Sequence, residues 1–391
     1  MRILVSGAGI GGSAATLFLR RSGHDVVTID KAPSLSRRGY VLSLKYFGLG
    51  LMKALGLYEE LKRFGIPFRT IQIRDAKGRL LREFSEDMAE QATKGTIFLQ
   101  RPDLHQVLYS AAAKVVPVRF GTYVTGIAQD RGAANVTFSD GRVEPFDLVV
   151  IAEGLHSSSR RLLWKDEGVH RFDIIYAATM IDADHAIPFE VFQFHFLPGA
   201  ALLFMPVNEK QVLLQCYFRG NLDTGDRQPQ IGKLLRRHCA KLPQPLREVM
   251  ESVAGRQNTF CDNVGMVSLP NLARRRAVVL GDAGYCPTFL SGMGASLALL
   301  GAKGLDICLG KNRSNLQGAL AEFNALMQPV IAHYQQNARV NVERMVSESS
   351  WRTLLHDLAL RLFPPSVLVN RMARQHEFES SLLRPFGDLI V

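Results

Sequence analysis

The sequence predicts a two-domain fold of mixed α/β class: a parallel sheet flanked by helices, an inserted antiparallel sheet, and helices at the C-terminal end. Three observations lead to this prediction. Residues 2–30 carry a β-α-β pattern, residues 192–196 alternate with period two, and the last hundred or so residues are mostly helical in pattern. A chain of 391 residues is long enough to build two closely packed cores.

The first 151 residues alternate strands and helices. Residues 2–6 are a short apolar strand, and residues 24–30 are a second strand rich in β-branched side chains. Between them a glycine-rich turn opens a helix that runs to about residue 21. The expected elements that follow are a helical region at 44–64, a hairpin at 69–84 with its turn at 75–78, a helix from 101 to about 114, and strands within 116–151.

The middle of the chain changes character. Period-two alternation at 192–196 is typical of a half-buried strand, and the runs 202–206 and 212–218 continue an antiparallel sheet. Residues 230–255 are helical in pattern, and residues 277–280 return to a buried strand of the parallel sheet. The expected domains are 1–168 with 268–330 for the parallel sheet, 169–267 for the inserted sheet with strands from 69–100 partly on its side, and 331–391 for the C-terminal helices.

Composition excludes several classes of function. The net charge is +11, but the 47 basic residues are spread along the chain, which favours a solvated surface over nucleic-acid binding. The five cysteines form no C-x-x-C pair and no histidine cluster has ligand spacing, so no metal site or disulfide framework is expected. No signal-peptide pattern and no run of about 18 apolar residues is present, which predicts a cytoplasmic protein without membrane insertion.

The glycine-rich turn carries the first chemical signal. Gly7, Gly9 and Gly12 form G-x-G-x-x-G between a strand and a helix, and Asp30 ends the second strand. Glycine permits the tight turn, lets the backbone approach a pyrophosphate, and allows close packing of helix on strand, while the helix N-terminus favours the phosphate charge. An acidic group at the end of the second strand can accept hydrogen bonds from a ribose. These features predict a Rossmann-type dinucleotide site, without distinguishing NAD from FAD.

Further motifs distinguish the two cofactors by resemblance. Residues 281–287 read Gly-Asp-Ala-Gly-Tyr-Cys-Pro, and residues 290–298 read Leu-Ser-Gly-Met-Gly-Ala-Ser-Leu-Ala at the start of a helix. The first run resembles the G-D motif of class A flavoprotein monooxygenases, the para-hydroxybenzoate hydroxylase-like family. Residues 147–161 resemble the D-G motif of that family, and residues 99–105 resemble its R-x-x-L-H segment. The ordered motifs span positions 7–298, most of the chain.

The resemblance implies an oxidoreductase that holds FAD and uses NAD(P)H and O2. The family binds NAD(P)H without a second Rossmann fingerprint, and none is present here. A flavin C4a-hydroperoxide would hydroxylate a small aromatic or polycyclic substrate, and the cofactor would supply the difficult chemistry. By its own chemistry Asp282 can bond a ribitol hydroxyl, and Gly292 and Gly294 can present backbone N–H groups at a helix start. The candidate cofactor-binding residues are Gly7, Gly9, Gly12, Asp30, Lys31, Arg38, Arg101, Glu153, Gly281, Asp282, Pro287, Gly292 and Gly294.

Two details refine the resemblance. Glu153-Gly154 stands where the family has Asp-Gly, which keeps the charge but adds a methylene and bears on coenzyme use. Residues 281–302 and the long helical C-terminus are most similar to the tetracycline-inactivating subgroup. That similarity implies either tetracycline-like substrates with a role in antibiotic resistance or oxidation of other polycyclic or phenolic substrates.

No catalytic residue is assigned from the sequence, because oxygen transfer demands a general base only for a phenol. The candidate substrate-binding residues on the inserted sheet are His195, Phe204, Tyr217 and Arg219. A monomer or homodimer is expected.

Three alternatives stay open. A flavin reductase or halogenase-like enzyme shares the fold, although no W-x-W-x-I motif is present. A non-catalytic flavin-binding protein is favoured only by Glu153. A membrane-associated enzyme is suggested by the basic amphipathic segment 351–363, which we expect instead to pack on the protein near the substrate entrance.

Overall fold

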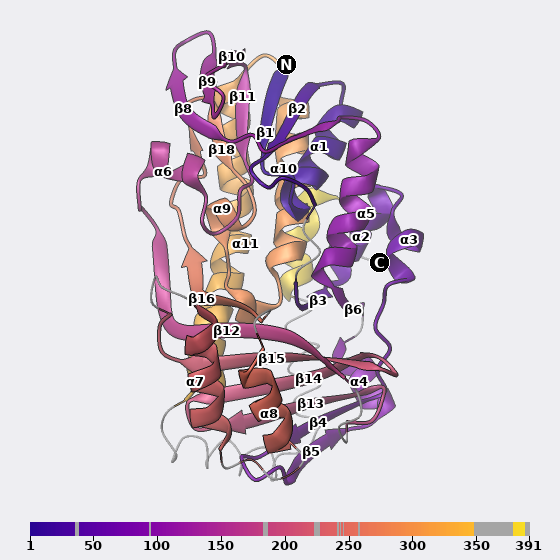
Figure 1. Cartoon of the computed structure of the whole chain (residues 1–391). Helices are drawn as coiled ribbons and strands as arrows, with labels where there is room; N and C mark the ends of the chain where they lie inside the picture. Colours follow the sequence, from indigo (N-terminus) through magenta and orange to yellow (C-terminus); the bar gives the residue numbers. More distant parts are fainter. Residues whose placement is uncertain are drawn as a thin grey trace.

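The computed structural model places two large sheets one above the other, connected by helices along one side (Figure 1). The described residues are 1–35, 39–93, 95–182, 187–222, 227–240, 242, 244, 246–256, 259–347 and 378–387.

The upper sheet has six strands and is parallel except for the pair at one edge. Its central strands are buried on both faces, as expected for a parallel sheet with helices or further strands on each side. In spatial order the strands are β17 (Ala273–Arg274), β18 (Ala277–Val279), β11 (Leu148–Ile151), β1 (Arg2–Ser6), β2 (Asp25–Asp30) and β7 (Val118–Phe120).

Helices of varied length pack beside this sheet and against one another (Figure 1). The region expected to be helical at 44–64 is two helices, because Gly56 has a φ of +71° and interrupts the first one. The helices are α1 (Ile10–Arg21), α2 (Tyr46–Ala54), α3 (Tyr58–Lys62), α5 (Arg101–Ala113), α10 (Gly294–Lys311) and α11 (Leu316–Met345).

Smaller elements complete the upper part. A three-stranded sheet packs beside β1, and a two-stranded ribbon lies between the two large sheets. They comprise β8 (Val124–Gln129), β9 (Ala134–Phe138), β10 (Val143–Phe146), β3 (Val41–Leu44), β6 (Ile97–Gln100), α6 (Ser158–Trp164), α9 (Asp282–Tyr285), and the 3-10 turns η1 (Phe289–Ser291) and η2 (Arg384–Phe386). The helix α4 (Glu86–Thr93) instead lies beside the lower sheet (Figure 1).

The lower sheet has seven strands, and two of them come from the N-terminal part of the chain. The hairpin of β4 and β5 joins its edge, where β4 runs parallel to β13. In spatial order the strands are β16 (Phe260–Val267), β12 (Val169–Asp182), β15 (Gln211–Arg219), β14 (Ala200–Asn208), β13 (Val191–Leu197), β4 (Thr70–Arg74) and β5 (Leu80–Phe84).

Both faces of this lower sheet are covered, which corrects the expectation of a half-buried strand. One face packs on α7 (Arg227–Cys239) and α8 (Leu246–Ala254), and the opposite face turns toward the upper part of the molecule. Phe192, Phe204 and His195 are all 0% exposed although they do not share one face. Alternation therefore does not separate core from solvent here.

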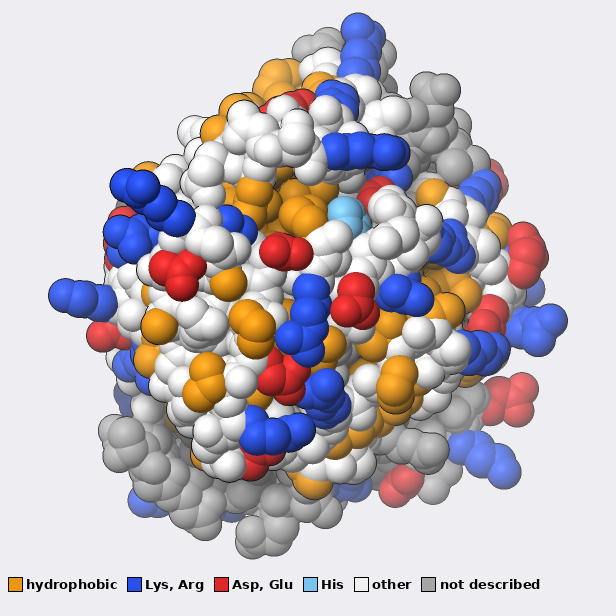
Figure 2. All heavy atoms as spheres, turned by 90° about the horizontal axis from the view of Figure 1, so that it is seen from above, with side chains coloured by type: hydrophobic (Ala, Val, Ile, Leu, Met, Phe, Trp, Pro, Cys, Tyr) orange, Lys and Arg blue, Asp and Glu red, His pale blue; other side chains and the backbone are white. Residues whose placement is uncertain are grey.

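The C-terminal region is described only in part. The expected boundary at 331 falls inside α11, which is one helix through Met345. Residues 378–387 pack back on the upper part, where Phe386 is buried. The amphipathic segment 351–363 lies outside the described residues, and no helix within the described ranges is long and apolar enough to cross a bilayer. On the face shown in Figure 2, Lys and Arg side chains lie among Asp and Glu, the mixed pattern of a solvated surface.

Candidate active site

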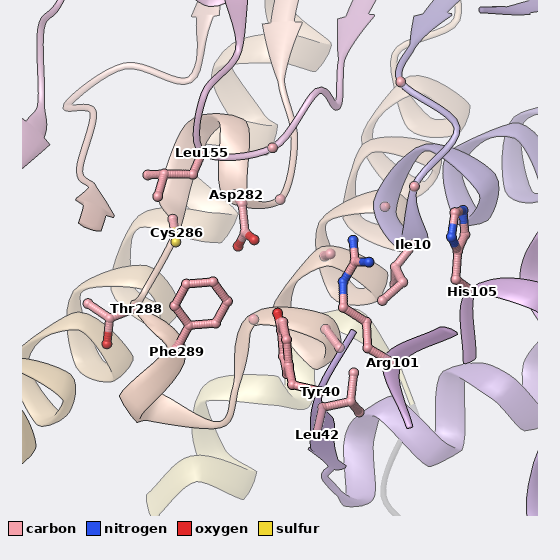
Figure 3. A pocket seen from close by; sticks show the side chains of 18 of the residues that line it. Ile10, Tyr40, Leu42, Arg101, His105, Leu155, Asp282, Cys286, Thr288 and Phe289 are labelled. Carbon is pink, nitrogen blue, oxygen red and sulfur yellow. The ribbon is translucent and has the colours of Figure 1, made fainter. Parts of the chain in front are cut away.

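A cavity of about 650 Å³ lies between the carboxyl ends of the upper sheet's strands and the inner face of the lower sheet. Its upper wall begins at the turn after β1 and includes the segments that follow β2, β7, β11 and β18. Its lower wall comes from β12 to β15, and the loop between α9 and α10 forms part of one side (Figure 3). Ligands of open α/β sheets bind at this edge.

The three fingerprint glycines act in three different ways. Gly7 has a φ of +101°, and a Cβ there would lie 2.5 Å from the Ala152 carbonyl oxygen. A Cβ on Gly12 would lie 1.7 Å from the Gly7 carbonyl oxygen, so this glycine lets α1 pack on the turn. A Cβ on Gly9 would meet no atom of the described residues within 4 Å, and Gly9 lines the cavity. The N-terminus of α1, with no side-chain cap, therefore opens toward a ligand.

Asp30 holds this turn from the end of β2. Its carboxylate accepts hydrogen bonds from the backbone N–H groups of Ala8 and Ala32, each at 2.8 Å. His105 of α5 donates from Nε2 to the Ala8 carbonyl at 2.7 Å, and burial lowers the pKa of this imidazole. Asp30, Lys31 and His105 all line the cavity.

Arg101, Tyr40 and Asp282 converge at the centre of the cavity. Figure 3 shows the Asp282 carboxylate, the Tyr40 hydroxyl and the Arg101 guanidinium turned toward one shared space. Burial raises the pKa of the Tyr40 hydroxyl, and the hydrogen bond and charge of Arg101 oppose that shift. Burial also raises the pKa of Asp282, and Arg101 again acts in the opposite direction. The arrangement provides hydrogen-bond donors and acceptors, together with a basic and an acidic group, for a polar ligand.

The loop from Gly281 to Gly294 closes this side of the cavity. Gly281 and Gly292 have φ values of +62° and +64°, in the region that favours glycine. Gly294 begins α10, and no side chain caps that helix. Pro287 does not line the cavity, whereas its neighbours Cys286 and Thr288 do. Pro287 therefore shapes the loop and does not face the ligand space.

Glu153 is bound by a group of serines. Its carboxylate accepts hydrogen bonds from the Ser6 hydroxyl at 2.5 Å, the Ser157 hydroxyl at 2.8 Å and the Ser159 backbone N–H at 3.0 Å. The Ser159 hydroxyl is also a donor to it. Glu153 lines the cavity, but its oxygens are occupied by protein donors that fix the loop after β11.

The inner face of the lower sheet is apolar and aromatic. Tyr217 lines the cavity, together with Phe194, Phe196, Leu203 and Met205. His195 and Phe204 lie on the opposite face, where their rings are 5.4 Å apart and Phe204 packs with α7 and α8. This corrects the expectation that they face the substrate, and the reason is that successive residues of a strand point to opposite faces.

Arg219 is also removed from the cavity wall. It lies two residues beyond Tyr217 on β15, but its Nε donates to the Val346 carbonyl at 3.1 Å and it does not line the cavity. It connects the sheet to the end of α11.

The structure thus brings most of the expected residues to one cavity. Those that line it are Gly7, Gly9, Asp30, Lys31, Arg101, Glu153, Tyr217, Gly281, Asp282, Gly292 and Gly294. Gly12 and Pro287 lie outside its wall, and Arg38 lies outside the described residues.

The lining residues that sequence reasoning did not select include Tyr40, His105 and Gln215. His105 belongs to the R-x-x-L-H segment and could have been chosen from it. Tyr40 and Gln215 carry no sequence signal.

Comparison with known proteins identifies the family. The family described as FAD binding domain matches residues 1–246 of this chain. The chain belongs to this family. It is an FAD-dependent monooxygenase with the class A flavin monooxygenase fold, its cofactor is FAD, and NAD(P)H is the reductant typical of the family.

Two relatives illustrate the similarity. FAD-dependent monooxygenase asL6 of Sarocladium schorii is 29% identical over 370 residues, which cover 86% of each chain. A flavin-dependent monooxygenase of Legionella longbeachae serogroup 1 is 26% identical over 346 residues, which cover 85% of this chain and 86% of the relative.

Solved structures share the fold at low sequence identity. Klebsiella pneumoniae HpxO, solved with FAD and uric acid, has a TM-score of 0.85 at 23% identity and covers 100% of this chain and 98% of its own. The tetracycline destructase Tet(51) has a TM-score of 0.74 at 24% identity, with coverage of 95% and 97%.

The residues present fit FAD. The open space at Gly9 and the uncapped start of α1 suit a pyrophosphate, and Asp30 lies at the ribose end. Arg101 and Asp282 lie farther along the same cavity, near the start of α10. FAD is a long molecule, so its site must extend without interruption from the glycine-rich turn to Arg101 and Asp282, as this cavity does.

Proposed function

We propose that this enzyme uses NAD(P)H and O2 to hydroxylate a small aromatic or polycyclic substrate, which is bound between FAD and the inner face of the lower sheet. In this proposal residues 169–267 serve as the substrate domain. The cofactor, when bound, supplies the redox chemistry and the activation of O2.

One observation carries the proposal: a single cavity runs from the glycine-rich turn to an aromatic wall on the lower sheet. The upper part has the polar groups that a dinucleotide needs. The lower part is apolar, with Phe194, Phe196 and Leu203 from two neighbouring strands. A planar apolar ring fits such a wall, and its burial there excludes water from the reacting atoms.

The chain's own residues act by position. Arg101 and Asp282 would orient the cofactor from one side, and the loop around Gly292 from another. Tyr176 and Tyr217 are protonated, because burial raises the pKa of both hydroxyls. Neither hydroxyl therefore acts as a base at neutral pH. Because these two tyrosines cannot remove a proton from the substrate, its ring needs to be electron-rich already.

The experiment uses the purified, FAD-loaded protein. NADH and NADPH oxidation is followed with a panel of phenols, naphthols and tetracyclines, and products are analysed for a mass increase of one oxygen atom. We expect at least one aromatic compound to accelerate oxidation and gain one oxygen. A flavin-loaded protein whose oxidation rate no compound changes, and which forms no oxygenated product, contradicts the proposal.

Tetracycline inactivation is the narrower form of the proposal. It is supported by the similarity of residues 281–302 to that subgroup and by the fold shared with Tet(51). Oxygenation of tetracycline by the purified enzyme, and protection of bacteria that express it, would support a role in antibiotic resistance. Oxygenation of simple phenols with no effect on tetracycline would exclude that role.

A further inference from the structure

The wall that the lower sheet contributes to the cavity carries no charged side chain among the described residues. Among the residues that the structure describes, the charged groups of the cavity are Asp30, Lys31, Arg101, Glu153 and Asp282, and all of them belong to the upper part. The polar side chains of the lower sheet that line the cavity are Tyr176, Gln215 and Tyr217.

Gln215 is held in one orientation, and its amide nitrogen has a donor that bonds no oxygen or nitrogen atom in the part of the chain that the structure describes. The Tyr176 hydroxyl donates to Gln215 Oε1 at 2.5 Å, since a neutral phenol has the proton to give. Gln215 Nε2 contacts the Met205 sulfur at 3.2 Å, and a thioether is a weak acceptor. An amide nitrogen has two N–H groups, so at least one is available to an acceptor in the cavity.

Tyr217 and Tyr176 provide a fixed aromatic surface beside this donor. The Tyr217 ring lies 5.0 Å from the Tyr176 ring, and Tyr176 stacks on Phe289 at 4.8 Å with an interplanar angle of 16°. The Tyr217 hydroxyl makes no hydrogen bond to any described residue, although the side chain is only 5% exposed. Two donors, Gln215 Nε2 and Tyr217 Oη, are therefore presented beside aromatic rings.

We propose that the substrate is an uncharged aromatic molecule, and that Gln215, held by Tyr176, and Tyr217 bind an oxygen atom attached to its ring. The inference rests on the proposed function, because it takes the lower half of the cavity as the substrate site. A carboxylate or ammonium against this wall would be buried without a counter-ion, which is strongly unfavourable. A carbonyl or hydroxyl oxygen would instead receive the donors that the wall offers.

The test compares two molecules of nearly the same shape and different charge. Naphthalene carboxamide and naphthalene carboxylate are titrated into the FAD-loaded enzyme, and binding is followed by the change in flavin absorbance. We expect the neutral amide to bind on the order of 100-fold more tightly than the anion. Equal affinities, tighter binding of the anion, or no binding of the amide overturns the inference.

Variants of two glutamines identify the binding group. Gln215→Leu should weaken carboxamide binding about 10-fold, and Gln215→Lys should raise carboxylate affinity above that of the wild type. Gln193→Leu is the matched control, because Gln193 is 5% exposed against 4% for Gln215 and its amide bonds Gln72 on the opposite face of the sheet. Equal effects of Gln215→Leu and Gln193→Leu contradict the assignment.

Flavin content separates this inference from the proposed function. Each variant is assayed for bound FAD before titration, since a protein without flavin gives no signal. A wild-type protein that binds no FAD contradicts the proposed function itself. A flavin-loaded protein that prefers the carboxylate leaves that function standing and contradicts only the substrate class.

Discussion

The upper and lower walls of the cavity differ in how they present their binding groups. The upper wall uses backbone and short side chains at the ends of strands, as at Gly9 and Asp30. The lower wall uses side chains from the middle of neighbouring strands, as at Gln215 and Tyr217. A strand end is fixed by local sequence, whereas a side chain in the middle of a strand points to a face that the neighbouring layers decide. The two walls should therefore respond differently to substitution.

The largest effect is expected at Gly9. Its backbone is extended, with a φ of −68° and a ψ of −168°, and a Cβ there meets no atom within 4 Å in the described ranges of the chain. Gly9→Val should therefore fold, fill the space of the pyrophosphate, and weaken FAD binding at least about 100-fold. Flavin content and the melting temperature of the apo-protein are the measurements.

Gly12→Ala is the contrasting variant at the same turn. Its Cβ would lie 1.7 Å from the Gly7 carbonyl oxygen, so folding stability should fall by about 3 kcal/mol. Normal flavin content in Gly9→Val, or equal stability losses in the two variants, would show that the open space at Gly9 is not where the cofactor lies.

His195 should affect stability and not substrate binding. Burial lowers the pKa of this histidine from 6.5 to about 4. The unfolded chain therefore binds a proton at His195 more readily than the folded protein does. As the pH falls from 6.5 to about 4, this difference lowers the free energy of unfolding by about 3 kcal/mol. His195→Leu should remove this loss, as measured by denaturant unfolding at pH 7 and pH 4. An unchanged acid loss, or altered carboxamide affinity, would contradict its position on the far face.

Asp282 should matter to both the cofactor and the apo-protein. Asp282→Ala is expected to weaken FAD binding by about 1–3 kcal/mol through loss of a buried charge-assisted hydrogen bond. Burial raises the pKa of this carboxyl, so its protonated form favours folding and apo-protein stability declines as pH rises through that pKa. Asp282→Asn should abolish that decline. If Asp282→Ala leaves the FAD dissociation constant unchanged, Asp282 only stabilises the N-terminus of α9 and does not bind FAD.

The smallest effect is expected from one hydroxyl of the lower wall. Tyr217→Phe keeps the ring beside Tyr176 and removes a donor, which should weaken carboxamide binding by about 1 kcal/mol. His195→Leu is the control on the opposite face. If the two variants give the same carboxamide affinity, the Tyr217 hydroxyl does not contact the ligand.

The sequence predicted the upper wall far better than the lower wall. The β-α-β pattern and the fingerprint glycines located the turn, because their spacing is a property of a few consecutive residues. Residues 192–196 showed period two, but β13 has protein on both faces, so the period could not distinguish Phe194, which lines the cavity, from His195 on the other face. Predicting that distinction requires knowledge that α7 and α8 cover one face, which is a tertiary fact.

Glu153 shows a second limit of sequence reasoning. The methylene that it adds to the family motif suggested altered coenzyme use, and the structure shows donors from Ser6, Ser157 and Ser159 around its carboxylate. Ser157 and Ser159 lie nearby at the start of α6, but Ser6 is at the end of β1, 147 positions away. A substitution read alone does not reveal the partners that accommodate it.

The parallel pairing of β4 with β13 limits how this molecule can be divided. Residues 70–74 pair with residues 191–195, so the lower sheet is a joint product of two distant stretches of chain. A fragment of residues 169–267 alone would expose the outer edge of β13, with a row of unsatisfied N–H and C=O groups open to other chains. Exchange of substrate specificity between relatives by recombination should therefore succeed only when the 70–84 hairpin travels with the segment that it borders. The lower sheet of this enzyme is therefore encoded by two separate stretches of its gene.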